Sequence, residues 1–201
     1  MQYSIHKLRS DVMARLGEIA RPQNALPSQP ALAAVPWPED IIGRKVTYLL
    51  GEIGSKSIKE APAEWLSGAP AISAGEVGMR MMPCGLYGAE VRLPEGFLRL
   101  TSVKMAGWSR SVCSLIIPGS AEWCRQWSAE TGISGCHARP RAYLDCGGDG
   151  FFLRLLGSEC ADDSLEWLCG WCVPAVDEEG FFEFPEGLYS ELAGAIADRL
   201  A

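Results

Sequence analysis

Eight cysteines and two histidines are the residues of this 201-residue chain that could bind a metal or carry out redox chemistry. One pair, Cys169 and Cys172, has the C-x-x-C spacing. A redox motif of this form requires its first cysteine at a helix N-terminus, which lowers the thiol pKa. Here the motif lies in an apolar segment, residues 165–173, that predicts a β-strand, so the two side chains would point to opposite faces about 10 Å apart. We therefore favour a structural role for both cysteines, with a redox pair as the alternative.

A zinc site would need four ligands in two close pairs. Cys169 and Cys172 could supply one pair, but the second would have to come from Cys136 and His137, which are adjacent. The other histidine, His6, lies in a predicted N-terminal helix. We therefore expect no metal and no cofactor, and a thiol or zinc protein built on the C-x-x-C remains an alternative.

The sequence lacks the common signatures of hydrolytic and nucleotide-dependent enzymes. It contains no G-x-S-x-G nucleophile elbow, no G-x-x-x-x-G-K-[ST] phosphate loop and no H-E-x-x-H zinc helix. The acidic clusters Asp162-Asp163 and Asp177-Glu178-Glu179 lie in loop-like stretches, which favours solvated carboxylates over catalytic ones. We expect a protein that is not an enzyme.

The composition is that of a globular protein. With 48% hydrophobic and 21% charged residues, we expect a compact, soluble chain with one or two domains. No apolar run approaches the ~18–20 residues of a membrane span, and residues 1–7 lack the apolar core of a secretion signal. The net charge of −7 argues against a nucleic-acid-coating protein. We expect an intracellular protein with reduced cysteines, and neither a membrane nor a sequence-specific nucleic acid as partner.

Helical periodicity dominates the two ends of the chain. A helix over residues 5–20 is predicted by an apolar stripe of Ile5, Leu8, Val12, Leu16 and Ile19. Because one helix of this length is marginal in water, its stripe must pack on its own domain or on a neighbouring subunit. A Pro-rich linker is predicted at residues 21–36. Further helices are predicted from residue 38 to a stop at Gly54, at residues 57–66 and at residues 184–200.

Between these helices, apolar and aromatic runs alternate with Gly, Pro and Ser clusters, which predicts strands joined by turns. The predicted strands are residues 88–92, 97–105, 111–117, 141–146, 151–156 and 165–173. A short helix is predicted at residues 120–131, and a hairpin turn at residues 147–150.

This order of elements predicts an α+β fold. A small helical layer from the N- and C-terminal helices would pack beside an antiparallel β-sheet or sandwich. The predicted domains are a helical part, residues 1–70 with 184–201, and a β-domain, residues 75–183.

Charge and aromatic residues suggest surfaces for protein contacts. Residues 159–201 carry eleven acidic and one basic side chain, whereas residues 1–158 carry 17 basic and 14 acidic ones. This asymmetry fits either a solvated acidic face or ends that meet different partners. Tryptophan is common in cores and interfaces, and the chain has seven. The candidate oligomer or partner interface consists of Ile5, Leu8, Val12, Leu16, Ile19, Trp108, Trp123 and Trp127.

A longer pattern runs through the second half of the chain. Its segments, in order, are Leu93-Pro94-Glu95-Gly96-Phe97-Leu98-Arg99-Leu100, Gly107-Trp108-Ser109-Arg110-Ser111-Val112, Trp123-Cys124-Arg125-Gln126, Arg139-Pro140-Arg141-Ala142, the hairpin at 147–150, Cys172-Val173-Pro174 and Phe184-Pro185-Glu186-Gly187-Leu188. The pattern resembles the head-to-tail adaptor proteins of tailed bacteriophages, particularly the tail-tubular-protein-A type of short-tailed phages. It covers residues 85–201, and the helical start at residues 1–66 is consistent in length and order. The eight cysteines and the Pro-rich linker depart from it.

The resemblance implies a structural virion protein that assembles in the bacterial host cytoplasm. Such a protein would form a homo-oligomeric ring below the portal, with a helical bundle for docking and a β-domain for contact with the next tail or nozzle protein. Its contacts would repeat around an axis, as head-to-tail contacts do in rings. The alternative function is a monomeric β-rich module that binds a glycan or a peptide through surface tryptophans.

Overall fold

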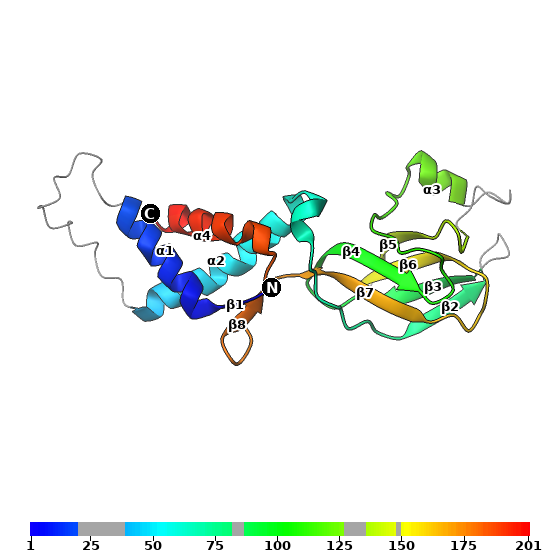
Figure 1. Cartoon of the computed structure of the whole chain (residues 1–201), viewed down its shortest axis with the longest axis horizontal. Helices are drawn as coiled ribbons and strands as arrows, with labels where there is room; N and C mark the ends of the chain where they lie inside the picture. Colours follow the sequence, from blue (N-terminus) through cyan, green and yellow to red (C-terminus); the bar gives the residue numbers. More distant parts are fainter. Residues whose placement is uncertain (20–38, 82–86, 127–135, 148–149) are drawn as a thin grey trace, which may run out of the picture. The chain divides into compact units, whose positions relative to one another are not determined.

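The computed structural model describes residues 1–19, 39–81, 87–126, 136–147 and 150–201. It has an α+β fold with antiparallel sheets. The chain divides into two compact units, a helical unit of Met1–Gly68 with Val173–Ala201 and a β-unit of Ala69–Cys172 (Figure 1). The predicted linker at residues 21–36 lies outside the described residues.

Three helices, one 3₁₀ turn and a small sheet build the helical unit. Its elements are β1 (Gln2–Ser4), α1 (Ile5–Ile19), α2 (Glu39–Glu60), the 3₁₀ turn η1 (Ala63–Leu66), β8 (Phe181–Glu183) and α4 (Glu186–Leu200). Helix α4 packs against both α1 and α2. The apolar stripes of the three helices are buried, with Leu8, Val12, Leu50, Ile58, Leu192 and Ile196 fully inside. Each such side chain stabilises the fold by about 1.5–3 kcal/mol through removal from water.

The sequence predicted that this helix ends at Gly54, but α2 continues to Glu60. A Cβ at Gly54 would lie 3.0 Å from Pro174 Cγ and 3.1 Å from Phe184 Cε2. The glycine therefore serves close packing inside the unit, which a sequence pattern cannot distinguish from a helix stop. Pro62 separates α2 from η1 and divides the predicted piece at residues 57–66.

Strand β1 near the N-terminus pairs with β8, which precedes the last helix, and the sequence did not predict either strand. They pair antiparallel, with Tyr3 opposite Phe182. The amide of Phe184 donates to the Met1 carbonyl at 3.0 Å, and the N-terminal ammonium donates to the Phe184 carbonyl at 3.2 Å. Residues 173–183 therefore belong to the helical unit, whereas the sequence assigned them to the β-domain.

The β-unit contains two antiparallel sheets and a short helix. Its elements are β2 (Val77–Met81), β3 (Tyr87–Arg92), β4 (Phe97–Met105), α3 (Ala121–Gln126), β5 (Arg141–Gly147), β6 (Gly150–Ser158) and β7 (Leu165–Cys172). One sheet has the order β2-β3-β6-β5, and the other pairs β4 with β7. Strands β5 and β6 form the predicted hairpin, with Gly147 opposite Gly150.

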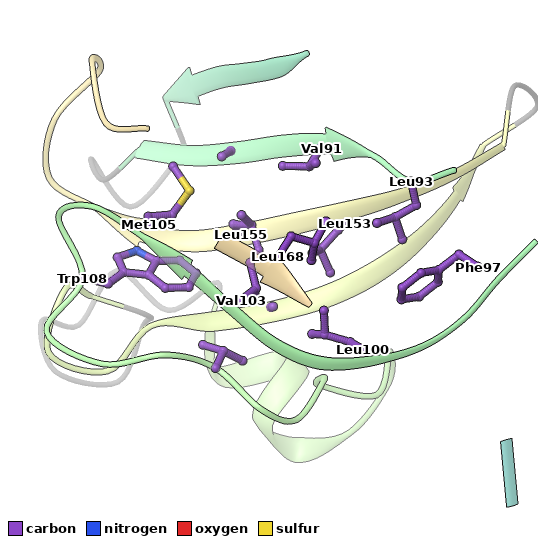
Figure 2. Close-up of a cluster of buried hydrophobic side chains, with 13 residues drawn as sticks. Val91, Leu93, Phe97, Leu100, Val103, Met105, Trp108, Leu153, Leu155 and Leu168 are labelled. Carbon is purple, nitrogen blue, oxygen red and sulfur yellow. The ribbon is translucent and has the colours of Figure 1, made fainter. Parts of the chain in front are cut away.

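A single hydrophobic cluster fills the space between the two sheets (Figure 2). Alternate residues of β3 and β6, such as Val91, Leu153 and Leu155, face Val103 and Met105 of β4. The period-2 alternation of β3 and β6 places one face of the four-stranded sheet in the core, opposite β4 and β7. The β-unit is thus an antiparallel sandwich.

Two other elements of the β-unit differ from the prediction. Residues 111–117 form no strand, because only Val112 bridges to β4, opposite Val103. Strand β2 was missed, since its sequence contains Gly78 and Arg80 and lacks a clear apolar run. The predicted helix at residues 120–131 is represented by α3, and residues 127–131 lie outside the described part.

Candidate interaction surface

The C-x-x-C motif lies in strand β7, as the sequence predicted. Cys169 is opposite Ser102 and Cys172 is opposite Phe97 of β4. In a strand, residues three positions apart point to opposite faces, so the geometry does not favour a redox pair. Within the ranges that the structure describes, no three His, Cys, Asp or Glu residues are grouped as metal ligands would be.

The two histidines are both exposed and lie in different units. His6 is in α1. The imidazole Nδ1 of His137 contacts the Glu159 carboxylate, and the backbone carbonyl of His137 accepts hydrogen bonds from the amide and the hydroxyl of Ser109. These contacts connect loops of the β-unit.

Asp163, predicted to be a solvated loop carboxylate, instead organises the loops at one end of the sandwich. Its Oδ1 accepts the Gly107 amide at 2.8 Å and the Ser164 amide at 3.0 Å. Its Oδ2 accepts the hydroxyl of Ser158 at 2.7 Å, and Ser158 is only 1% exposed. Asp163 therefore satisfies a buried hydroxyl and two backbone donors.

Asp163→Ala is expected to destabilise the β-unit by about 2–3 kcal/mol, because it leaves the buried Ser158 hydroxyl and two amides without their acceptor. Asp162→Ala is the matched control, since Asp162 is exposed, and its effect should stay within about 0.5 kcal/mol. Urea denaturation of the purified protein measures both. Equal stability of the two variants would contradict the role given to Asp163.

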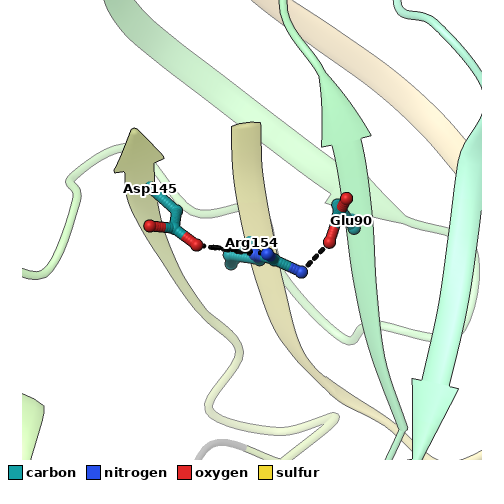
Figure 3. A network of polar contacts seen from close by, with 3 residues as sticks. All are labelled: Glu90, Asp145 and Arg154. Atoms are coloured by element: carbon teal, nitrogen blue, oxygen red, sulfur yellow. Dashed lines mark hydrogen bonds and ion pairs between the residues drawn. The ribbon is translucent and has the colours of Figure 1, made fainter. Parts of the chain in front are cut away.

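Arg154 occupies the outer face of the four-stranded sheet, between carboxylates from both neighbouring strands (Figure 3). It forms an ion pair with Glu90 of β3, and its Nε and Nη2 donate to Asp145 Oδ2 of β5 at 3.2 and 3.1 Å. Burial, and to a smaller extent Arg80, lowers the pKa of Arg154. Because Arg154 of β6 binds carboxylates of both neighbouring strands, we interpret this cluster as a structural contact that stabilises the sheet.

Two tyrosines stack in the helical unit. The rings of Tyr3 and Tyr189 lie 4.2 Å apart with an interplanar angle of 13°, and Lys7 Nζ lies above both. The hydroxyl of Tyr189 donates to Asp11 Oδ2 at 2.9 Å. Burial, followed by the hydrogen bond to Asp11, raises the pKa of Tyr189 well above its ordinary value.

This raised pKa predicts a loss of stability at alkaline pH. The folded Tyr189 stays neutral where an unfolded tyrosine, with a pKa near 10, ionises. Its contribution is therefore complete below pH ~10 and is lost as the pH rises further. We expect Tyr189→Phe to cost about 1 kcal/mol at neutral pH and to flatten the decline above pH ~10. Urea denaturation across pH measures the free energy of unfolding, with the exposed Tyr48→Phe as the control. A Tyr189→Phe protein whose stability declines above pH ~10 as steeply as that of the wild type would contradict the role of Tyr189.

Four of the eight predicted interface residues are buried inside the two units. Ile5, Leu8 and Val12 are buried in the helical unit, and Leu16 is half-buried. These three buried residues therefore do not form an open contact surface in the folded chain, because α1 packs on α4 of its own unit. The side chain of Ile19 is outside the described residues.

The two predicted interface tryptophans that the structure describes are likewise not an open platform. Trp108 is 3% exposed and belongs to the sandwich core. Trp123 of α3 is half-buried and packs edge-on against Tyr143, with 4.5 Å between ring centroids. Trp127 lies outside the described residues.

An exposed stripe on α2 is the surface that the sequence reading missed. Tyr48 is 70% exposed and Ile41 is 42% exposed, although both are large and apolar in part. They lie seven residues apart on the side of the helix opposite the buried Val46 and Leu50. The i, i+7 spacing of Ile41 and Tyr48 is visible in the sequence. The prediction of this helix used only the apolar stripe that turned out to be buried.

A groove opens at one end of the sandwich, beside the turn between β3 and β4. It is lined by Ser73, Gly75, Arg92, Leu93, Pro94, Glu95, Gly96, Gly150 and Phe151. Its ionisable groups are Arg92 and Glu95. This lining offers a contact surface more readily than a set of acid–base groups.

No helix in the described ranges combines the length and apolar character required to cross a membrane. Comparisons with protein-family models, with curated proteins and with solved structures found no match to this chain.

Proposed function

We propose that this chain is a structural protein of a tailed bacteriophage virion, a head–tail adaptor that assembles into an oligomeric ring between the portal and the tail. Exposed Tyr48 and Ile41 on α2 carry the proposal, because aromatic residues are enriched in protein interfaces. No catalytic role is part of the proposal.

The segments that resemble phage adaptors support it by their positions in the fold. The turn at Pro94–Gly96 introduces β4, and Gly96 has a positive φ of 79°. Arg139 and Pro140 precede β5, and Pro185 precedes the first turn of α4. The pattern therefore coincides with turns and element starts in both units, where backbone geometry restricts the choice of residue.

The direct test is co-assembly with the portal protein of the same phage, followed by electron microscopy. We expect a ring of this protein on the portal, even if the isolated protein is monomeric. Absence of any complex with the portal or with the neighbouring tail protein would refute the adaptor function.

A monomeric glycan- or peptide-binding module is the second candidate, because Trp167 is 37% exposed on β7. Lys104 Nζ lies 4.9 Å above the Trp167 ring and forms an ion pair with Glu166 at 2.7 Å. A lysine over the ring occupies the surface on which a sugar would stack, which weakens this candidate. Glycan-array binding by a monomer that Trp167→Ala abolishes would establish it.

A further inference from the structure

One side of α2 presents a cationic surface with an aromatic centre. We define the α2 stripe as Ile41, Arg44, Lys45, Tyr48, Glu52 and Lys56, all of them exposed. Their spacing of three or four residues places them along one side of the helix. Three cations and one carboxylate give the stripe a net positive charge. Tyrosine and arginine are also the residues most enriched among interface hot spots.

The same unit carries a surface of the opposite sign. Residues 173–201 carry exposed carboxylates at Asp177, Glu178, Glu179, Glu183, Glu186, Glu191 and Asp198. Glu191 and Asp198 lie seven residues apart on α4, on a side that packs against neither α1 nor α2, as their exposure shows. Arg199 is the only cation between Val173 and Ala201. We call Glu191 and Asp198, on this exposed side of α4, the acidic surface.

We propose that the α2 stripe of one copy binds the acidic surface of a second copy in a head-to-tail contact. The inference rests on the proposed adaptor function and identifies the surfaces that would join its subunits. Two different patches on one protomer that recognise each other generate a ring when the rotation closes. Opposite charges would guide the encounter and set the register, and Tyr48 would supply the desolvated centre.

A second copy fits the α2 stripe better than the other occupants do. Residues 20–38 contain one charged residue, Arg21, and so have no carboxylate to complement the stripe. A nucleic acid would meet a chain of net charge −7, whose own carboxylates would repel phosphates. The acidic surface supplies the required charge within the same polypeptide.

Charge reversal with mutual rescue tests the contact in the full chain. One variant carries Arg44→Glu with Lys56→Glu, and the other carries Glu191→Lys with Asp198→Lys. All four side chains are exposed and make no ion pair within the described residues, so the fold should persist. The control variant reverses two exposed arginines of the β-unit, Arg110→Glu with Arg125→Glu.

We expect each α2 or α4 variant alone to weaken association by about tenfold or more, because like charges would face each other. An equimolar mixture of the two should restore it, since every stripe can then meet a surface of opposite sign. The β-unit control should associate as the wild type does. Sedimentation velocity over a range of protein concentration and salt, with circular dichroism for folding and microscopy on the portal, provides the measurements.

The outcomes separate this contact from the adaptor function. Rings on the portal that both reversals leave unchanged, or a mixture that fails to regain association, would overturn the contact and leave the adaptor function standing. Rescue by the mixture without any portal complex would support the contact and refute the adaptor function. A wild-type protein that stays monomeric both alone and with the portal would refute both.

Discussion

Phe184→Ala is expected to destabilise the helical unit by about 3–5 kcal/mol, the usual cost of removing a fully buried aromatic side chain. Phe184 is 0% exposed, and its ring packs against α2 beside Gly54. Its backbone also pairs with Met1 in both directions. Because a domain of this size is stable by only about 5–15 kcal/mol, the loss should be visible as a large drop in the urea midpoint.

The neighbouring Phe181 provides the matched control. It lies three residues away in β8 and is 37% exposed, so Phe181→Ala removes the same atoms from a half-solvated position. We expect its cost to stay below about 1.5 kcal/mol. If the two alanine variants unfold at the same denaturant concentration, the buried position of Phe184 is wrong.

Gly170→Ala is expected to cost about 2–3 kcal/mol, because the added methyl group cannot fit without movement of the backbone. A Cβ at Gly170 would lie 2.6 Å from the Arg99 carbonyl oxygen and 2.8 Å from Ile72 Cδ1. Gly170 lies between Cys169 and Trp171 in β7, where its amide also donates to the Pro70 carbonyl. The glycine of the C-x-x-C motif thus serves strand packing. Thermal or urea denaturation measures the loss.

Gly78→Ala distinguishes this crowding from the general effect of adding a side chain to a strand. Gly78 lies in β2, and a Cβ there would come no closer than 4.0 Å to the Glu90 carbonyl oxygen. We expect Gly78→Ala to be neutral or slightly stabilising, since alanine reduces the entropy of the unfolded chain. A Gly170→Ala protein as stable as the Gly78→Ala protein would contradict the packing described for β7.

Local patterns predicted most regular elements. The apolar stripe that begins at Ile5 predicted α1, and an apolar and aromatic run bounded by turn residues predicted β4 with both of its ends. The turn before β4 was also predicted, and Gly96 in it adopts a positive φ, which residues with a Cβ disfavour. These signals are local, since they depend on residues within one or two turns of each other.

The interaction surface was less accessible to sequence reasoning. The stripe of Ile5, Leu8 and Val12 has the right spacing for a partner helix, but the same spacing also serves the core of its own unit. Only packing shows that α4 covers it. Conversely, the interface predicted from the sequence did not include Tyr48, and only its 70% exposure marks it as a surface residue.

By itself, the sequence determined that this chain has an α+β composition, where its helices and long strands lie, and that its C-x-x-C motif belongs to a strand. Only the tertiary structure decided where the helical unit ends, which stripe is covered and which carboxylate organises a loop. The reason is the range of the interactions. The pairing of Tyr3 with Phe182 and the hydrogen bond from Gly107 to Asp163 join residues far apart in the chain, and short strands or single side chains have no periodic signal.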